Sequence, residues 1–336
     1  MQIKQVAEKL HTTTRTIRYY EEKGLIEPEK MENDYRVFNE EQVEQLKVIL
    51  ALREVGMSTS QIKQTITHQG AMDRKLSEQR SALYSEWLEI RDMVETLDDL
   101  LKSDQKNLVD KARALKQMKE KRKSWKDQWD FDSQAGTYQS DLKKEGHGFN
   151  VHEGYDEALG YAHRIVEAKV GETGLDIGIG TGNLGSRYLA DGASVIGVDQ
   201  SEEMLKMCRE QHPEIDTRSG HFLQLPVMSQ SVDFITTSYA LHHVKEEDKP
   251  LALEEMARVL KPNGRLVIAD LMFDDEEGRR GVLRNYEAAG NDEAVEAIED
   301  EYYGNRSRIK EKLMQLGYRV KVRKINHILT VIHAEK

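Results

Sequence analysis

Cysteine is nearly absent from this 336-residue chain, in which Cys208 is the only one. A single thiol excludes an internal disulfide and a cysteine-based zinc cluster, and it is typical of a reducing compartment. No apolar run approaches the roughly eighteen residues that a membrane span needs, and the sequence opens on a polar amphipathic segment rather than on a signal peptide. We therefore expect a cytoplasmic protein with no membrane partner and no bound metal.

Positive charge is in deficit, because the net charge is -11 and the isoelectric point is near 5.6. This balance argues against a protein that coats nucleic acid nonspecifically, but not against a specific reader with a few clustered cations. The charged fraction of 32 % exceeds the usual fraction of about a quarter and fits a long exposed helix. The length and the composition together suggest two domains and a connector.

Proline and glycine are missing from residues 71–131. In this stretch apolar residues recur in the a/d pattern of a coiled coil, at Leu76, Leu83, Trp87, Ile90, Val94, Leu97, Leu101, Leu108, Leu115 and Met118. One continuous helix would be about 90 Å long. A single domain cannot bury a helix of this length, so we expect the helix to pair with the same helix of a second copy in a homodimer. The alternative is a charged helix folded back on its own domain.

The first residues predict two short helices joined by a polar turn. The second helix, through Ile17 to about Lys23, presents Arg15, Arg18 and Tyr19, which is the arrangement of a DNA-binding helix-turn-helix. The alternating residues 35–38 predict a small wing. Residues 1–36 carry equal numbers of cationic and acidic side chains, so a helical protein-binding module is the alternative, and any DNA affinity must come from how the cations are arranged.

Residues 14–21 (TRTIRYYE), 24–26 (GLI) and the Tyr35–Arg36 pair resemble the MerR-family winged helix-turn-helix. The resemblance covers about the first seventy residues and is followed by the coiled-coil helix typical of that family. It implies a homodimer that binds and distorts double-stranded promoter DNA. The DNA contacts that it implies are Thr14, Arg15, Arg18, Tyr19, Tyr35 and Arg36.

Glycine is concentrated in residues 174–185 (GLDIGIGTGNLG), where an apolar strand runs into a turn and then a helix. Such a turn lets the backbone approach a ligand closely. A second apolar strand ends at Asp199, the position at which such folds bind ribose hydroxyls. Gly180, Gly182 and Gly185 fit the dinucleotide fingerprint. However, Asp176 would repel a pyrophosphate and suits the cationic S-adenosylmethionine better, so the two cofactors remain competitors at this point.

Further strands at residues 232–237 and 266–270, a helix at 309–316 and a terminal hairpin at 318–325 and 327–333 complete a pattern that resembles the class I, Rossmann-like S-adenosylmethionine-dependent methyltransferases. Residues 238–244 (SYALHHV) and 260–264 (LKPNG) resemble the small-molecule enzymes related to ubiquinone and menaquinone biosynthesis. The resemblance implies S-adenosyl-L-methionine as cofactor and a small-molecule methyl acceptor. The cofactor-binding residues that it implies are Asp176, Gly178, Gly180, Gly182, Asp199, Met204, His221 and Ser238.

One position departs from that family, because His221 stands where an acidic residue usually accepts a hydrogen bond from the adenine amino group. A neutral imidazole could accept the same bond with one nitrogen. Methyl transfer needs mainly alignment, so the catalytic candidates are a base, His242 or His243, and Tyr138 of the N-terminal cap. The histidine pair could instead only fix its loop. We expect the acidic insert at residues 273–303 to form a lid over the acceptor.

These patterns predict a multidomain chain. Residues 1–71 form an all-α winged helix-turn-helix, residues 72–128 a long dimerisation helix, and residues 129–336 an α/β Rossmann-like methyltransferase domain. Three functions remain open: a regulator with an active methyltransferase, a regulator whose methyltransferase-like domain is a non-catalytic sensor of S-adenosylmethionine or a metabolite, and an enzyme whose N-terminal head only dimerises it.

Overall fold

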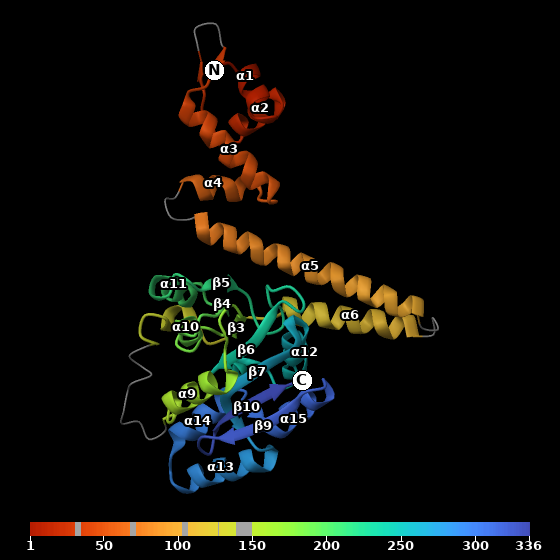
Figure 1. Cartoon of the computed structure of the whole chain (residues 1–336), viewed down its shortest axis with the longest axis vertical. Coiled ribbons are helices and arrows are strands. Elements are labelled where there is room, and N and C mark those ends of the chain that lie inside the picture. Colours follow the sequence, from red (N-terminus) through yellow and green to blue (C-terminus); the bar gives the residue numbers. More distant parts are fainter. Residues whose placement is uncertain (31–34, 68–71, 103–106, 127, 139–149) are drawn as a thin grey trace. The chain divides into compact units, whose positions relative to one another are not determined.

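The computed structural model describes residues 1–30, 35–67, 72–102, 107–126, 128–138 and 150–336. They form two compact units, residues 1–83 and 84–336 (Figure 1). Within the described ranges, no helix is both long and apolar enough to cross a lipid bilayer.

The first unit consists of short helices around one apolar core. Its elements are α1 (Ile3–Lys9), α2 (Thr14–Glu22), β1 (Glu29–Lys30), β2 (Arg36–Val37), α3 (Glu40–Glu54), α4 (Thr59–Thr67) and the start of α5 (Met72–Lys102). Thr13 caps α2, because its hydroxyl accepts a hydrogen bond from the amide of Thr16 at 3.0 Å. The wing strands pair antiparallel. The core side chains Val6, Ile17, Leu46, Ile49 and Met57 are fully buried. The predicted winged helix-turn-helix is confirmed.

The single helix predicted over residues 72–128 is wrong, because the structure has two helices there. α5 ends at Lys102, and α6 (Leu108–Lys123) returns antiparallel beside it (Figure 1). Ion pairs link the two helices, between Lys111 and Asp99 at 3.3 Å and between Lys123 and Glu89 at 3.1 Å. Residues 103–105, across which the heptads were expected to continue, lie outside the described ranges. A heptad pattern cannot reveal the tertiary contacts that α6 gains by turning back.

Two faces of α5 within the second unit have different environments. The predicted seam residues Ile90, Val94 and Leu97 are 57 %, 50 % and 58 % exposed. On another face, Leu88 is fully buried. Trp87, itself one of the predicted seam residues, is half-buried, and its ring lies 5.5 Å from the guanidinium of Arg258 in the α/β part. The part of the seam from Ile90 to Leu101 is therefore exposed, whereas Trp87 packs against the α/β part.

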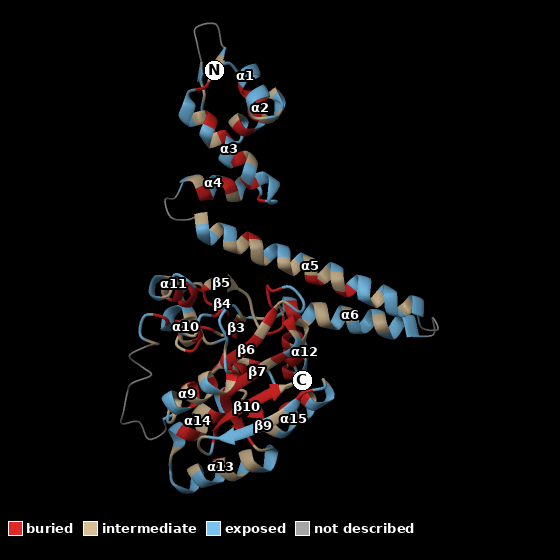
Figure 2. Ribbon diagram, viewed as in Figure 1, coloured by how far each residue is buried: buried red, intermediate tan, exposed pale blue. Residues whose placement is uncertain are grey.

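The α/β part of the second unit is built on an eight-stranded sheet whose central strands are buried (Figure 2). The strand order is β5-β4-β3-β6-β7-β10-β9, with β8 beside β7. Strands β3 to β7 are parallel, and β10 runs antiparallel between β7 and β9. The strands are β3 (Thr173–Ile177), β4 (Ser194–Asp199), β5 (Asp216–Ser219), β6 (Val232–Ser238), β7 (Leu260–Phe273), β8 (Gly304–Asn305), β9 (Arg319–Lys324) and β10 (Leu329–Glu335). This is the predicted Rossmann-like sheet with its terminal hairpin.

Helices cover both faces of this sheet, and a separate core lies on each face. One core includes residues of α9 (Tyr155–Val166), α10 (Gly185–Ala190) and α11 (Glu202–Gln211), and the other includes residues of α12 (Lys249–Val259) and α15 (Arg306–Gln315). Alternate residues of the central strands face the two cores, as the period of two in a strand requires. The insert after β7 forms α13 (Glu276–Ala288) and α14 (Asp292–Asp300). A short α7 (Phe131–Gln134) precedes the sheet.

Candidate functional site

The glycine-rich turn after β3 lies at the carboxyl edge of the sheet. Gly178, Gly180 and Gly182 have φ angles of 69°, 53° and 95°, which residues with a side chain rarely adopt. A Cβ at Gly178 would also lie 2.3 Å from the Cβ of Ala240. The amide of Gly180 donates to Oδ2 of Asp199 at 2.8 Å. The turn is thus held against the end of β4, where its backbone can approach a bound ligand closely.

A cavity of about 230 Å³ opens beside this turn. It is lined from the carboxyl ends of β3, β4 and β6, at the point where the strand order reverses. Ligands bind at this place in open parallel sheets. The predicted site residues that line the cavity are Tyr138, Gly178, Gly180, Asp199, Met204, His221, Ser238, His242 and His243. The structure therefore brings together residues predicted for the cofactor and residues predicted for catalysis.

Asp176 and Gly182 are not among the lining residues. Asp176 is buried beneath the turn, where its carboxylate accepts hydrogen bonds from the Thr236 hydroxyl at 3.0 Å and from the backbone of Gly185. Burial raises the pKa of this carboxyl to about 7. A Cβ at Gly182 would lie 2.7 Å from the ring of His212. In this structure Asp176 fastens the start of α10 to the sheet, and its contact with the amino group of a cofactor stays a prediction.

The residues for a nucleoside come from β4, α11 and the segment after β5. Asp199 is the last residue of β4 and also accepts a hydrogen bond from the amide of Ser201 at 3.0 Å. An ionised carboxylate only accepts hydrogen bonds, which suits the two hydroxyls of a ribose. Met204, in the first turn of α11, adds an apolar wall. These residues and the glycine cradle fit an adenosyl cofactor.

His221 presents a different hydrogen-bonding group from the one that we expected. Its Nδ1 accepts a hydrogen bond from the amide of Leu223 at 3.3 Å, and burial lowers its pKa to about 3. The ring is therefore neutral, and its single hydrogen must be on Nε2. Nε2 can then donate a hydrogen bond but cannot accept one. The expectation that this imidazole accepts from an adenine amino group disagrees with this tautomer, because the backbone already uses its acceptor nitrogen.

On the other side of the site, His242 is held by a buried carboxylate. Its Nδ1 lies 2.5 Å from Oδ1 of Asp270, and the other carboxylate oxygen accepts from the amides of Ala240 and Leu241 at 3.2 Å and 2.6 Å. An acceptor at Nδ1 fixes the hydrogen on that nitrogen and leaves Nε2 for a ligand. Nε2 lies 3.6 Å from a carboxylate oxygen of Glu301, the residue after α14.

The charges of this cluster depend on burial and on one another. Burial alone would lower the pKa of His242, but the adjacent Asp270 carboxylate outweighs it and the pKa is raised. Burial raises the pKa of Glu301 and lowers that of His243 well below its ordinary value. The Asp270 carboxylate therefore favours the protonated form of His242. The ligand atoms of His242, His243 and Glu301 lie within 4.8 Å of one another, so they could alternatively hold a divalent metal ion.

Tyrosine hydroxyls form part of the cavity wall. Burial raises the pKa values of Tyr138 and Tyr239, and it raises that of Tyr155 to about 12. These groups stay protonated at neutral pH and can donate hydrogen bonds. Tyr138, a predicted catalytic residue, is thus placed in the site as a donor rather than as a base.

Several lining residues were not predicted from the sequence as site residues, among them Trp125, Gln200 and Glu301. Glu301 was visible only as one carboxylate of an acidic insert, and Trp125 only as an aromatic residue near a helix end. Asp270, which orients His242, interrupts the apolar run of β7 near the carboxyl edge of the sheet. A polar residue at that place was the one available signal.

The predicted DNA-contacting residues lie on α2 and the wing of the first unit. Arg15, Arg18 and Tyr19 are exposed on α2, and Tyr35 is 61 % exposed. Arg36 forms an ion pair with Glu21 of α2 at 2.5 Å, so it ties the wing to the helix. Thr14 is the first residue of α2.

Two family descriptions match the chain. "MerR HTH family regulatory protein" matches residues 1–69, and "Methyltransferase domain" matches residues 175–268. An uncharacterized methyltransferase of Alkaliphilus oremlandii is 35 % identical over 208 residues, which are 61 % of this chain and 95 % of that protein. Another, of Oceanobacillus iheyensis, is 28 % identical over 207 residues, with the same shares covered.

Among solved structures, phosphoethanolamine N-methyltransferase 2 of Haemonchus contortus, in complex with S-adenosyl-L-methionine, is 18 % identical. The match has a TM-score of 0.47 and covers 61 % of this chain and 57 % of that one. The YcgJ protein of Bacillus subtilis is 24 % identical with a TM-score of 0.42, over 50 % of this chain and 71 % of that one.

Proposed function

Because this chain belongs to the methyltransferases and carries a MerR helix-turn-helix over residues 1–69, we propose that it is a DNA-binding transcriptional regulator that also methylates a small molecule. Its cofactor is S-adenosyl-L-methionine. As a regulator of transcription it would act on double-stranded promoter DNA in the cytoplasm.

The observation that carries the enzymatic part is that an oriented histidine lines the same cavity as the glycine turn. When bound, the cofactor supplies a methyl group on a cationic sulfur, and the sulfur keeps the bonding electron pair as a neutral thioether leaves. An acceptor with an O–H or N–H group must lose its proton as the new bond to the methyl carbon forms. Nε2 of His242 can take that proton, because Nδ1 is committed to Asp270.

The raised pKa of His242 gives this proposal a pH signature. The ring acts as a base only when it is neutral, so methyl transfer should become faster as the pH rises through a value above the ordinary histidine pKa of about 6.5. Glu301, beside Nε2, would also favour an acceptor that carries positive charge.

DNA binding is supported by the exposed cations on α2. Arg15 and Arg18 stand one turn apart on this helix, where the recognition helix of a helix-turn-helix reaches the major groove. Dimerisation is supported by the exposed apolar seam of α5, in which Leu101 is 85 % exposed. Such a seam is stable in water when a second copy covers it.

The test of enzymatic function is transfer of a labelled methyl group from S-adenosyl-L-methionine to metabolite fractions by the full-length protein. We expect a labelled product, and we expect His242→Ala to lose it while still binding the cofactor. His163→Ala is the matched control, because His163 pairs with Asp191 and does not line the cavity. Cofactor binding without any labelled product would instead identify a sensor.

A further inference from the structure

One wall of the cofactor cavity comes from the helical hairpin rather than from the sheet. Trp125 follows the carboxyl end of α6 and lines the cavity. Its indole stacks on the ring of His221, with centroids 4.8 Å apart and planes 4° from parallel. Its Nε1 donates to Oε1 of Gln200 at 2.6 Å. Both partners adjoin the residues that would hold the nucleoside, because Gln200 follows Asp199.

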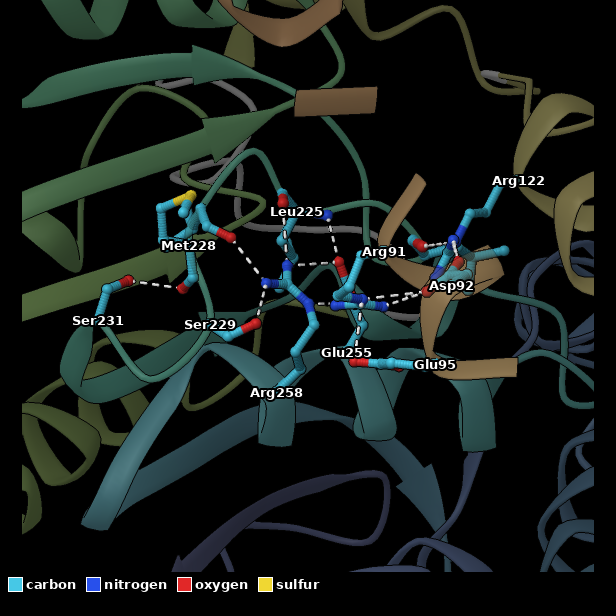
Figure 3. Close-up of polar contacts among 12 residues, drawn as sticks. Arg91, Asp92, Glu95, Arg122, Leu225, Met228, Ser229, Ser231, Glu255 and Arg258 are labelled. Atoms are coloured by element: carbon cyan, nitrogen blue, oxygen red, sulfur yellow. Dashed lines mark hydrogen bonds and ion pairs between the residues drawn. The ribbon is translucent and has the colours of Figure 1, made fainter. Parts of the chain in front are cut away.

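A buried charge pair fixes the position of Trp125. Arg122, three residues earlier, is 7 % exposed and donates from Nε to the carbonyl of Leu223 at 2.9 Å. Its guanidinium also forms an ion pair with Asp92 of α5 (Figure 3). Leu223 stands two residues after His221. The same arginine therefore connects α5, the end of α6 and the segment that carries His221.

The rest of the hairpin is fastened to the same segment. Trp87 of α5 lies 5.5 Å from the guanidinium of Arg258. Arg258 in turn donates to the carbonyls of Leu225 and Val227 at 3.2 Å and 2.8 Å (Figure 3). Residues 221–227 thus lie between the cofactor cavity and the docked hairpin, and the position of the hairpin decides whether Trp125 can reach the cavity.

We propose that Trp125 is a cofactor-binding residue that the hairpin contributes, so that S-adenosyl-L-methionine and the docked position of the α5–α6 hairpin stabilise one another. The proposal rests on the proposed function, since it names a residue and a regulation of the same site. A purine offers a flat π face, which an indole binds by stacking. By linkage, anything that displaces the hairpin must weaken cofactor binding by the same factor by which the cofactor opposes the displacement.

The direct test is calorimetric titration of the full-length protein with S-adenosylhomocysteine, the unreactive product form of the cofactor. Trp125→Ala should weaken binding about tenfold or more, which is the effect of losing one base–aromatic stack, whereas Trp125→Phe should keep most of the affinity. Lys126→Ala is the control, because this neighbour is exposed and does not line the cavity. Equal affinities of the wild type and Trp125→Ala would overturn the proposal.

The linkage has a separate test on α5. Asp92→Ala removes the partner of Arg122 without touching the cavity lining, so it should weaken binding several-fold. Its effect should not add to that of Trp125→Ala, because both act through one contact. Glu95→Ala is the matched control: this exposed carboxylate lies on the same helix and pairs only with Arg91, at 3.6 Å, among the ion pairs described.

Two outcomes would refute the linkage: an Asp92→Ala variant with unchanged affinity, or fully additive effects of the two substitutions. A lower unfolding temperature with unchanged affinity would assign Trp125 a purely structural role. A wild-type protein that binds no S-adenosylhomocysteine would remove the proposed function itself. A failure of Trp125→Ala to fold would leave Trp125→Phe and Asp92→Ala to decide.

Discussion

The buried carboxyl of Asp176 should make the stability of the second unit depend on pH in an unusual direction. Its pKa is about 7 in the folded chain and about 3.9 when unfolded. Between these values the folded unit retains a proton that the unfolded chain has lost. The free energy of unfolding should therefore fall as the pH rises from about 4 to about 7, and the loss should be complete above both pKa values. At about 1.4 kcal/mol per pKa unit, the full shift corresponds to about 4 kcal/mol.

The substitution Asp176→Asn isolates this effect, because an amide has the shape of the carboxyl but does not ionise. Trp87, Trp125 and Trp129 are the three tryptophans of the chain, and all lie in the second unit. Denaturant unfolding followed by tryptophan emission therefore reports on the unit that contains Asp176. We expect the variant to gain stability relative to the wild type as the pH is raised, by up to about 4 kcal/mol.

The exposed Asp156, in the first turn of α9, provides the control. Asp156→Asn makes the same chemical change at an exposed position and controls for the loss of one carboxyl group. Parallel stability profiles of wild type and Asp176→Asn between about pH 4 and pH 8 would refute the reasoning, since they would mean that Asp176 titrates alike in the folded and unfolded chains.

Further predictions concern the cavity, the seam and the DNA surface. Gly178→Ala should abolish cofactor binding, as titration can measure, because its Cβ would lie 2.3 Å from that of Ala240 at a φ angle that costs a side-chain-bearing residue about 1 to 2 kcal/mol. His242→Ala should lower the rate of methyl transfer about a hundredfold or more at nearly unchanged cofactor affinity; an unaltered rate would exclude His242 as the base. Leu97→Glu should give a monomer in sedimentation, whereas Met314→Glu, at an exposed residue of α15, should not. Arg18→Ala should weaken promoter binding and lower the salt slope by about one unit, with Lys47→Ala of α3 unaffected in a gel-shift titration.

Local sequence patterns predicted most of the fold and the cofactor side of the site. The glycine turn, Asp199 and the order of strands and helices follow from short-range signals, because each depends on backbone conformation or on the period of apolar residues. The cofactor side of the cavity was predictable for the same reason. The position of Asp176 below the turn was not, since a strand residue's face depends on register with β6.

The positions of the α5–α6 hairpin and of the acceptor side of the cavity depend on contacts between residues that are far apart in the sequence. Glu301 reaches His242 only because α13 and α14 return the chain to the carboxyl edge of the sheet, and an acidic insert gives no sign of which carboxylate will be buried. Likewise, the heptads of α5 predicted an apolar seam, but the burial of Arg122 against Asp92 decided where α6 would lie. Long-range charge pairing of this kind leaves no periodic trace in a sequence.

The tautomer of His221 has a consequence for discrimination among purines. A carboxylate at this position would favour adenine, whose amino group at C6 can donate to it. It would reject hypoxanthine, which bears a carbonyl oxygen at C6 instead. An imidazole that can only donate lacks this preference, because it can donate to an oxygen at the same edge as well as to a ring nitrogen of adenine. A deaminated, inosine-type analogue of the cofactor should thus compete at this pocket far better than it would at one closed by an acid.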